Sequence, residues 1–458
     1  MLYYLIKFIY GRPRNEHMNL TERDSALLNK VTSYSRGNEA YWSFKGRAKR
    51  QYCHALIQYP AMMVPAMQGE LIDAVLETDL NVKSIIDPFV GSGTTLGEAM
   101  CRGLDFVGID INPLSILACE VKSGPLYIDA FNLKYSVLTK KVQNDKSIDV
   151  AVQIKNIDKW FTKEVQQDLS KLYRAIQAEK SKWARKIFWL CMSNTVRTVC
   201  NSRGSTFKLH IKSSEQIGST PNTLEVFAKN IEKSIVALKQ QKAVLEEMGN
   251  LRRAISKSKV SIMHADTSKT MKKNFQCDLL VSSPPYGDNN TTVTYGQFSY
   301  LSLKWIDERD IDNLEIKGLL ENQNKIDSSS LGGSLRQASE KLESLRCKSP
   351  SLIRAVNEIQ EVNPDNIKKL ITFIFDLDLA LDNSLLNLRD NAYMIWTLGN
   401  RRISNIEIPL DSIMKELLEY KGCSFIHQIE REIPSKRMAI KNNIASTMDK
   451  ELILMMRK

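Results

Sequence analysis

The chain contains no pair of cysteines at C-x-x-C spacing. Its eight cysteines stand singly, and most have apolar neighbours: Cys53, Cys101, Cys119, Cys191, Cys200, Cys277, Cys347 and Cys423. Paired spacing is typical of zinc sites and redox motifs, whereas disulfide frameworks are typical of secreted proteins. We therefore predict reduced thiols in the core of a cytoplasmic protein, with no metal site.

The sequence also lacks an apolar run long enough to cross a membrane. Residues 1–10 are apolar, but a spanning helix needs about 20 residues. No small-residue cleavage site follows them, so they do not resemble a secretory signal. We interpret residues 1–51 as an N-terminal extension, with Met18 as an alternative start, and expect no association with membranes.

Positive charge is concentrated in one part of the chain. The 458 residues carry a formal net charge of +12, yet residues 121–260 alone hold 26 Lys and Arg against 12 Asp and Glu. A basic segment attached to a near-neutral body favours contact with a polyanion. The alternative is a solvated helical face.

A glycine-rich loop follows the first predicted strand, Val82–Ile86. The loop reads Asp87-Pro-Phe-Val-Gly-Ser-Gly-Thr-Thr95, and apolar residues at helical spacing come after it. Gly91 and Gly93 allow a ligand to approach the backbone, and we expect Thr94 or Thr95 to cap the helix. This strand–loop–helix pattern predicts a cofactor site.

Asp110 ends the next predicted strand, Asp105–Ile109, where an acidic residue of a βαβ unit binds ribose hydroxyls. A nucleoside cofactor is therefore plausible. A dinucleotide is disfavoured because Leu96 replaces the third glycine of G-x-G-x-x-G, and because the Asp87 carboxylate repels pyrophosphate. A cationic sulfonium or ammonium group tolerates that carboxylate.

The tetrapeptide Ser283-Pro284-Pro285-Tyr286 follows the apolar run 277–281, which predicts a buried strand. Two prolines fix the backbone and hold the residue before them extended. The Ser283 hydroxyl and the Pro284 carbonyl can accept hydrogen bonds from an amine, and Tyr286 offers a face for stacking. For these four residues alone, a strand-ending turn is the other interpretation.

Together the motifs resemble those of the amino-methylating DNA methyltransferases, which use S-adenosylmethionine. Tyr59-Pro-Ala61 is similar to that family's N-terminal cofactor motif and His264-Ala-Asp266 to its adenine-contacting acid. The resemblance covers residues 52–118, 258–305 and the C-terminal strands. It implies that Ser283, Pro284, Pro285 and Tyr286 are catalytic. It implies a cofactor site made of Tyr59, Pro60, Asp87, Phe89, Gly91, Gly93, Thr94, Thr95, Asp110, Ile111 and Asp266.

The resemblance implies an α/β, Rossmann-like fold with a mostly parallel sheet and an antiparallel C-terminal strand, and the helical pattern of residues 119–258 predicts a mainly helical inserted domain. We assign the catalytic core to residues 52–118, 259–306 and 367–458. The gap at 119–258 is too long for an ordinary connection, and we assign it to a basic DNA-recognition insertion. Residues 307–366 form a second insertion.

The segment 197–212 mixes basic and small polar residues, which suits contacts with phosphates and base edges. We predict double-stranded DNA as the partner and expect the following residues to contact it: Arg197, Arg203, Lys208 and Lys212.

The function implied is methylation of an exocyclic amine in DNA, as the modification enzyme of a restriction-modification system with a cognate endonuclease. We expect the protein to be prokaryotic and nucleoid-associated. Ser283 favours cytosine-N4, since the adenine-N6 enzymes of this family mostly carry Asp or Asn there. Carbon-5 methylation requires a cysteine nucleophile, and the chain has no Pro-Cys pair. The alternatives are adenine-N6 methylation, RNA guanine-N2 methylation and an inactive nucleic-acid-binding protein.

Overall fold

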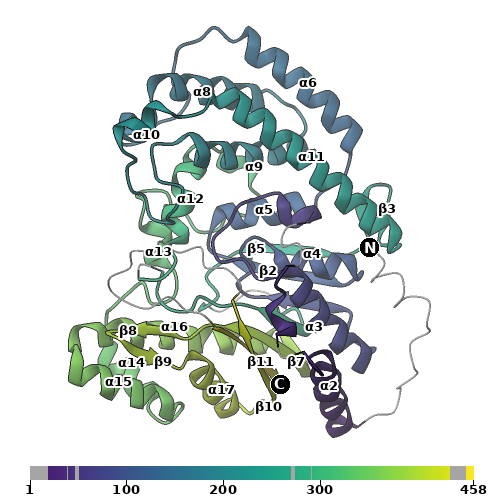
Figure 1. Cartoon of the computed structure of the whole chain (residues 1–458), viewed down its shortest axis with the longest axis vertical. Coiled ribbons are helices and arrows are strands. Elements are labelled where there is room, and N and C mark those ends of the chain that lie inside the picture. The colour runs from purple at the N-terminus through teal and green to yellow at the C-terminus, as the bar shows by residue number, and fades with distance from the viewer. Residues whose placement is uncertain (1–18, 39, 47–50, 270–273, 290, 434–449) are drawn as a thin grey trace.

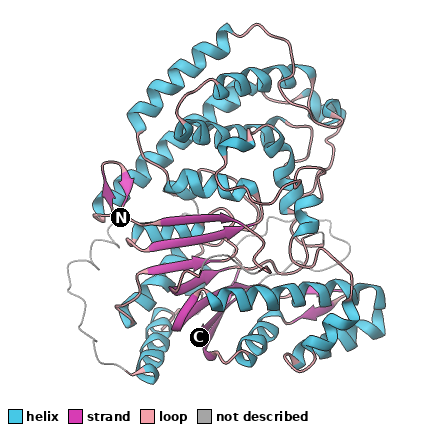
Figure 2. Cartoon of the chain, turned by 180° about the vertical axis from the view of Figure 1, so that it is seen from behind, coloured by secondary structure: helices cyan, strands magenta, loops and turns pink. Residues whose placement is uncertain are grey.

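A seven-stranded sheet forms the centre of the molecule in this computed structural model (Figures 1 and 2). The structure describes residues 19–458 except 39, 47–50, 270–273, 290 and 434–449, so the apolar segment 1–10 lies outside it. The strand order is β10-β11-β7-β6-β1-β2-β5. The strands are β1 (Ser84–Asp87), β2 (Asp105–Asp110), β5 (Val260–His264), β6 (Cys277–Ser282), β7 (Leu388–Leu398), β10 (Ser424–Glu432) and β11 (Lys450–Arg457).

Most neighbouring strands of the sheet are parallel. Strands β7, β6, β1, β2 and β5 form the parallel part. Strand β11 pairs antiparallel with β7, and β10 pairs antiparallel with β11 at the edge. This arrangement confirms the predicted Rossmann-like sheet with an antiparallel C-terminal strand.

Successive residues of the central strands face two different cores, because side chains alternate across a strand. Ile85 and Leu279 belong to one core, and Ile86 and Leu280 belong to the other. Helices α3 (Pro65–Thr78), α4 (Thr94–Cys101) and α5 (Pro113–Ser123) pack in the first core. Helices α14 (Ala338–Leu345), α15 (Pro350–Val362), α16 (Ile367–Leu386) and α17 (Leu410–Tyr420) pack in the second.

The first described helix, α2 (Leu20–Tyr34), is fastened to the last strands of the sheet. Asp24 accepts hydrogen bonds from the Tyr393 hydroxyl at 2.8 Å and from Arg457 Nε at 3.0 Å. Buried Leu27 and Val31 contribute to the first core. This part of the predicted extension is therefore packed against the sheet.

A layer of helices lies above α5 in Figure 1 and belongs to the basic segment. It consists of α6 (Ile128–Asn144), α7 (Ile157–Trp160), α8 (Lys163–Gln177), α9 (Lys182–Val199), α10 (Ser214–Gly218) and α11 (Thr223–Glu247), followed by the short hairpin of β3 (Leu251–Arg252) and β4 (Ile255–Ser256). Helix α9 packs on α5 and on α12 (Tyr295–Lys304). The domain boundary proposed at 118/119 falls inside α5, which continues to Ser123.

Residues 307–366 contain α13 (Lys325–Ser329), α14 and α15, with short turns η3 (Glu308–Asp310) and η4 (Pro364–Asn366). The Arg185 guanidinium of α9 forms an ion pair with Asp310 at 2.6 Å. Trp189 Nε1 donates to the same carboxylate at 2.7 Å. The two proposed insertions are therefore joined through Asp310. No helix in the described ranges is long and apolar enough to cross a membrane.

Candidate active site

A pocket lies at the carboxyl edge of the sheet, where the chain order reverses between β1 and β6. Strands β2 and β5 continue the sheet beyond β1, and β7 continues it beyond β6. Open α/β sheets bind ligands at such a point. The space between the lining residues is about 840 Å³, including the part that opens to solvent.

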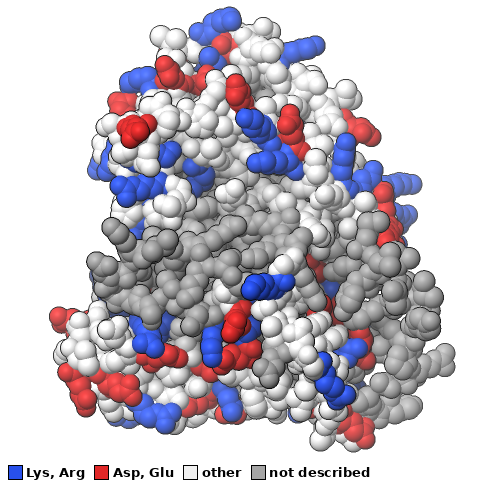
Figure 3. Space-filling view, viewed as in Figure 1, with Lys and Arg blue, Asp and Glu red and all other residues white. Residues whose placement is uncertain are grey.

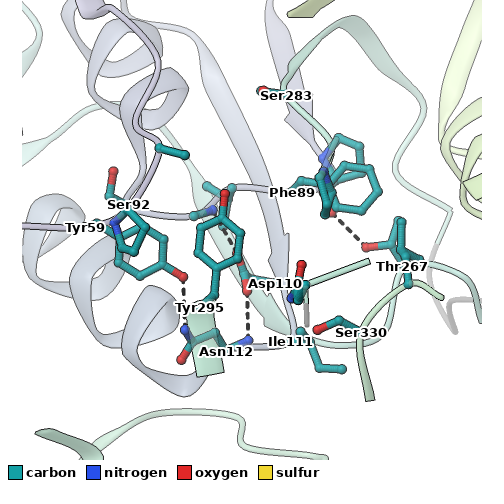
Figure 4. A pocket seen from close by; sticks show the side chains of 18 of the residues that line it. Tyr59, Phe89, Ser92, Asp110, Ile111, Asn112, Thr267, Ser283, Tyr295 and Ser330 are labelled. Carbon is teal, nitrogen blue, oxygen red and sulfur yellow. Dashed lines mark hydrogen bonds between the residues drawn. The ribbon is translucent and has the colours of Figure 1, made fainter. Parts of the chain in front are cut away.

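The pocket brings together ten of the residues predicted as site residues (Figure 4). They are Tyr59, Pro60, Phe89, Gly91, Thr94, Asp110, Ile111, Asp266, Ser283 and Pro285. Figure 4 labels Tyr59, Phe89, Asp110, Ile111 and Ser283. Five others are not part of its lining: Asp87, Gly93, Thr95, Pro284 and Tyr286. Three motifs far apart in the sequence therefore converge on one space.

The glycine loop between β1 and α4 adopts a left-handed backbone at Gly91 and Gly93, with φ of +49° and +75°. Residues other than glycine rarely adopt this conformation. Gly93 is itself the N-cap of α4, without a side-chain cap. The prediction that Thr94 or Thr95 caps the helix is therefore wrong. The Thr95 hydroxyl instead donates to the Val281 carbonyl of β6 at 3.3 Å.

The Asp110 carboxylate faces the glycine loop from the end of β2. Its Oδ2 accepts from Gly91 N and its Oδ1 from Asn112 N, both at 2.8 Å. Burial raises the pKa of Asp110 to about 6, although these two backbone hydrogen bonds lower it. A carboxylate has about four lone-pair sites. Both oxygens can therefore accept further hydrogen bonds from vicinal hydroxyls.

Asn112 and Tyr59 build the wall beside Asp110. Asn112 Nδ2 donates to the Tyr59 hydroxyl at 3.0 Å and to Ser299 Oγ at 2.8 Å. The Tyr59 ring stacks on Tyr295, with centroids 5.6 Å apart and planes inclined by 28°. Tyr295 lies between Tyr59 and Asp110 in Figure 4. The N-terminal motif, β2 and α12 therefore share one wall.

The Asp87 carboxylate lies behind the pocket and links its two principal loops. Its Oδ1 accepts from Ser282 Oγ at 2.6 Å and from Phe89 N at 3.1 Å. Burial raises the pKa of Asp87 to about 6, and the bond from Ser282 opposes this shift. Within the described residues, Oδ2 has no hydrogen-bond partner. Asp87 therefore braces the loops and does not face a ligand directly.

The tetrapeptide places Ser283 and Pro285 in the pocket and turns Tyr286 away. Ser283 Oγ donates to the Tyr286 hydroxyl at 3.3 Å, and that hydroxyl donates to Glu451 at 3.4 Å. The Tyr286 ring packs against the second core. Burial raises the pKa of Tyr286 well above its usual range. In this conformation Tyr286 supports Ser283 and does not present its ring to the pocket.

Asp266 follows β5 and lines the pocket. Its Oδ1 accepts from Ser268 N at 3.0 Å and Ser268 Oγ at 2.7 Å. The neighbouring Thr267 hydroxyl donates to the Pro88 carbonyl at 2.7 Å. This contact holds the loop after β5 against the glycine loop after β1. The carboxyl ends of β5 and β1 therefore contribute to the same pocket.

Several lining residues escaped the sequence analysis. They are Asn112, Asn289, Ile326, Ser330 and Leu331, and Tyr295 was not assigned to the cofactor site. Three of them come from the segment 307–366. Its polar composition gave no indication of a pocket wall. Only its packing against α12 reveals this role.

Buried Lys122 of α5 was also missed. Its Nζ donates to the Gly93 carbonyl at 3.2 Å, so it holds the glycine loop from behind. Burial lowers the pKa of Lys122. A charged residue at the end of an apolar helix gave no signal of this contact in the sequence.

The four residues predicted to contact DNA have different environments. Arg203 and Lys208 are exposed, whereas Lys212 Nζ donates to the Cys200 carbonyl at 2.7 Å. The Arg197 guanidinium lies 4.3 Å from the centroid of the Phe298 ring, and its Nη1 is buried. Arg197 is therefore packed between the helical layer and α12, unlike a freely exposed phosphate contact.

Figure 3 shows one face of the molecule, on which Lys and Arg of the helical layer are interspersed with Asp and Glu. All eight cysteines are free thiols, as predicted, and only Cys347 is exposed. The described part of the chain contains no group of three or more His, Cys, Asp or Glu suited to hold a metal.

Curated relatives of this chain are methyltransferases. The Type II methyltransferase M.MvaI of Kocuria varians is 30% identical over 460 residues, covering 96% of this chain and 98% of the relative. M.MjaII of Methanocaldococcus jannaschii is 31% identical over 135 residues, or 27% of this chain and 25% of that protein. M.BsoBI of Geobacillus stearothermophilus is 30% identical over 124 residues, or 27% and 22%.

No protein-family profile and no solved structure matches the chain. The similarity to M.MvaI nevertheless spans both proteins almost completely, including the helical layer and the segment 307–366. It agrees with the Rossmann-like sheet and with the convergence of the glycine loop and the tetrapeptide on one pocket. The chain therefore belongs to the Type II DNA methyltransferases of restriction-modification systems.

Proposed function

We propose that the protein transfers a methyl group from S-adenosylmethionine to the N4 amine of a cytosine flipped out of double-stranded DNA. The observation that carries this proposal is that Asp110, the glycine loop and Ser283 line one continuous pocket. Asp110 can bind the ribose of the cofactor, and Ser283 can accept a hydrogen bond from the amine of the target base. Both ligands would then meet in the same pocket.

The hydrogen-bond acceptors and apolar surfaces of the pocket fit S-adenosylmethionine. Asp110 retains acceptor capacity for two ribose hydroxyls, while Phe89 and Ile111 provide apolar surfaces suited to an adenine ring. The carboxylates of Asp110 and Asp266, which line the pocket, suit a cationic ligand better than a pyrophosphate. When bound, the cofactor supplies an electrophilic methyl group on its sulfonium.

Ser283 is the residue we assign to the target amine. The Tyr286 hydroxyl accepts the Ser283 proton, so the lone pairs of Ser283 Oγ remain free to accept an amine N–H. Pro284 and Pro285 fix the backbone beside Ser283, and they have no N–H that could donate to its hydroxyl. Orienting the amine in this way directs its nitrogen lone pair along the path of transfer. The hydrogen bond from Ser282 Oγ to Asp87 supports the backbone next to Ser283, so the Ser283 hydroxyl is positioned before a base binds.

The choice of base rests on Ser283, because a resemblance to the adenine-N6 enzymes would favour Asp or Asn at this position. Adenine-N6 methylation is the second candidate, since adenine also presents an exocyclic amine. RNA guanine-N2 methylation and inactive nucleic-acid binding are less well supported, because the expected polar positions are filled and the whole chain resembles a Type II methyltransferase.

The test is to express the protein in a host that lacks DNA methylation and to sequence its genomic DNA with detection of modified bases. N4-methylcytosine within one short motif is expected. N6-methyladenine would correct the base while keeping the chemistry. Transfer of tritiated methyl groups to RNA and not to DNA, or formation of 5-methylcytosine, would reject the proposal. The motif found also defines the duplex for every assay below.

A further inference from the structure

His264, the last residue of β5, is bound through both ring nitrogens to other segments of the chain. It is only 1% exposed. Its Nε2 lies 2.9 Å from the carbonyl oxygen of Ile111, which lines the pocket. Its Nδ1 lies 3.2 Å from Glu315 N and 3.4 Å from Ile316 N, both in the segment 307–366. One buried imidazole therefore joins this segment to the pocket.

The partners of His264 decide where its proton lies. A carbonyl oxygen can only accept a hydrogen bond, so Nε2 must carry the proton and donate to Ile111. A backbone N–H can only donate, so Nδ1 must offer its lone pair, which Glu315 N and Ile316 N share. Burial lowers the pKa of His264, in agreement with a neutral ring. The imidazole is therefore neutral and protonated on Nε2.

The Nε2 side of the ring supports the turn that carries Asp110. The backbone pairing of β2 with β5 ends at Asp110 and His264. Beyond it, Ala265 N donates to the Asp110 carbonyl at 3.0 Å. The imidazole adds the next bond, to the Ile111 carbonyl. The place of Ile111 beside the Asp110 carboxylate, visible in Figure 4, therefore depends on Nε2.

The Nδ1 side of the ring supports a stretch without regular structure. Glu315 and Ile316 lie outside helices and strands, between η3 and α13. Backbone N–H groups in such a stretch need other partners, and Nδ1 serves two of them. The chain then continues to three residues that line the pocket: Ile326, Ser330 and Leu331.

We infer that His264 is a positioning residue whose two ring nitrogens have separate tasks. Nε2 fixes the Ile111 side of the cofactor pocket, and Nδ1 docks residues 315–316 on the catalytic core. This inference rests on the proposed function, because the ligand of the pocket is taken to be S-adenosylmethionine.

Replacement of His264 by Gln and by Asn separates the two nitrogens. The amide nitrogen of Gln can stand where Nε2 lies, and the amide oxygen of Asn can stand where Nδ1 lies, but neither amide replaces both. Two quantities are measured on the full chain. Calorimetry gives the dissociation constant of S-adenosylhomocysteine, and hydrogen–deuterium exchange gives the protection of peptides that contain Glu315 and Ile316.

The two variants are expected to show opposite patterns. His264→Gln should bind S-adenosylhomocysteine within about twofold of the parent, while exchange at residues 315–316 becomes roughly three- to tenfold faster. His264→Asn should keep the parental exchange but bind roughly tenfold more weakly, because the Ile111 carbonyl loses its partner and fewer molecules hold the turn in the binding geometry. His427 of the edge strand β10 is the control, and its Gln and Asn variants should match the parent in both measurements.

A histidine that only fills space would give the same change in both variants, and that result overturns the inference. Either folded variant alone also overturns it by showing the pattern expected of the other. If neither folds, nitrogen NMR of the parent labelled with ¹⁵N-histidine decides: one imidazole protonated only on Nε2 is expected, and its absence contradicts the assignment. If the parent binds no S-adenosylhomocysteine, the proposed function fails, while exchange at residues 315–316 still tests Nδ1.

Discussion

Asp87 and Ser282 are joined by a 2.6 Å hydrogen bond between the carboxyl ends of β1 and β6. The same carboxylate oxygen accepts from Phe89 N in the glycine loop. The glycine loop and Ser282, the residue before Ser283, therefore form hydrogen bonds to the same buried oxygen. A shift of either loop is transmitted to the other.

Ser282→Ala should lower the free energy of unfolding by about 1.5–3 kcal/mol, because it removes a hydrogen bond to a buried ionised group. Urea denaturation at pH 8 measures this, since Asp87, with a pKa of about 6, is then ionised. Ser302→Ala is the control: Ser302 is equally buried but donates to the neutral Ser193 carbonyl at 3.1 Å. About 0.5–1.5 kcal/mol is expected there. Equal losses would contradict a charged partner.

Ser283→Ala should slow methyl transfer while leaving cofactor affinity unchanged, because in the proposed mechanism the hydroxyl contacts the amine and not the cofactor. Single-turnover rates on the cognate duplex measure the first effect and calorimetry the second. Tyr286→Phe removes the group that accepts the Ser283 proton and should slow transfer less. A parental rate in Ser283→Ala would show that another residue holds the amine.

Asp110→Ala should weaken binding of S-adenosylmethionine by roughly ten- to a hundred-fold, since a charge-assisted acceptor is worth about 1.5–3 kcal/mol. Isothermal calorimetry of the folded variant gives the value directly. Unchanged affinity would mean that the ribose lies elsewhere in the pocket.

Cofactor affinity should fall as the pH is lowered through about 6, where Asp110 becomes protonated. Asp110→Asn should bind the cofactor weakly, and its affinity should change less with pH.

The pH dependence of folding stability that Asp110 causes has the opposite sign to that of cofactor affinity. The pKa of Asp110 in the folded chain exceeds its ordinary value of about 4, so the folded state binds more protons between the two. This group therefore favours folding most at low pH, and its contribution declines as pH rises through about 6.

Replacing Arg203 and Lys208 together by Gln should reduce the slope of log affinity against log salt for DNA. The expected reduction is about 0.9 for each phosphate that the variant no longer neutralises. Both side chains are exposed, whereas Arg197 is stacked on Phe298 and is better left intact. Lys233 and Lys239, exposed on α11, form the matched control pair. A change in slope only in the control pair would place the DNA on α11.

The residues that could be predicted from sequence lie at strand ends. Asp110 and Ser283 each follow a short apolar run, and a strand followed by glycine or proline is a local pattern. Their meeting in one pocket followed from the parallel order of the strands. The cofactor role of Asp110 and the catalytic role of Ser283 remain predictions.

What escaped prediction depends on contacts between distant segments. Nothing near Asp327 in the sequence shows that its carboxylate accepts hydrogen bonds from Gly296 N and Gln297 N in the first turn of α12. The environment of Arg197 was missed for the same reason, because a basic residue is expected to be exposed until its aromatic partner is known. The prediction that Thr95 could cap α4 failed because its hydroxyl donates a hydrogen bond to the Val281 carbonyl on β6.

The position of β11 constrains the order in which the molecule can be completed during synthesis. Its eight residues, the last strand of the chain, lie between β7 and β10, both of which leave the ribosome earlier. Arg457 then reaches Asp24, 433 residues away. Such distant pairings form late and slowly. A nascent chain halted before residue 450 would expose two unpaired strand edges, so the sheet cannot close before residues 450–457 have been translated.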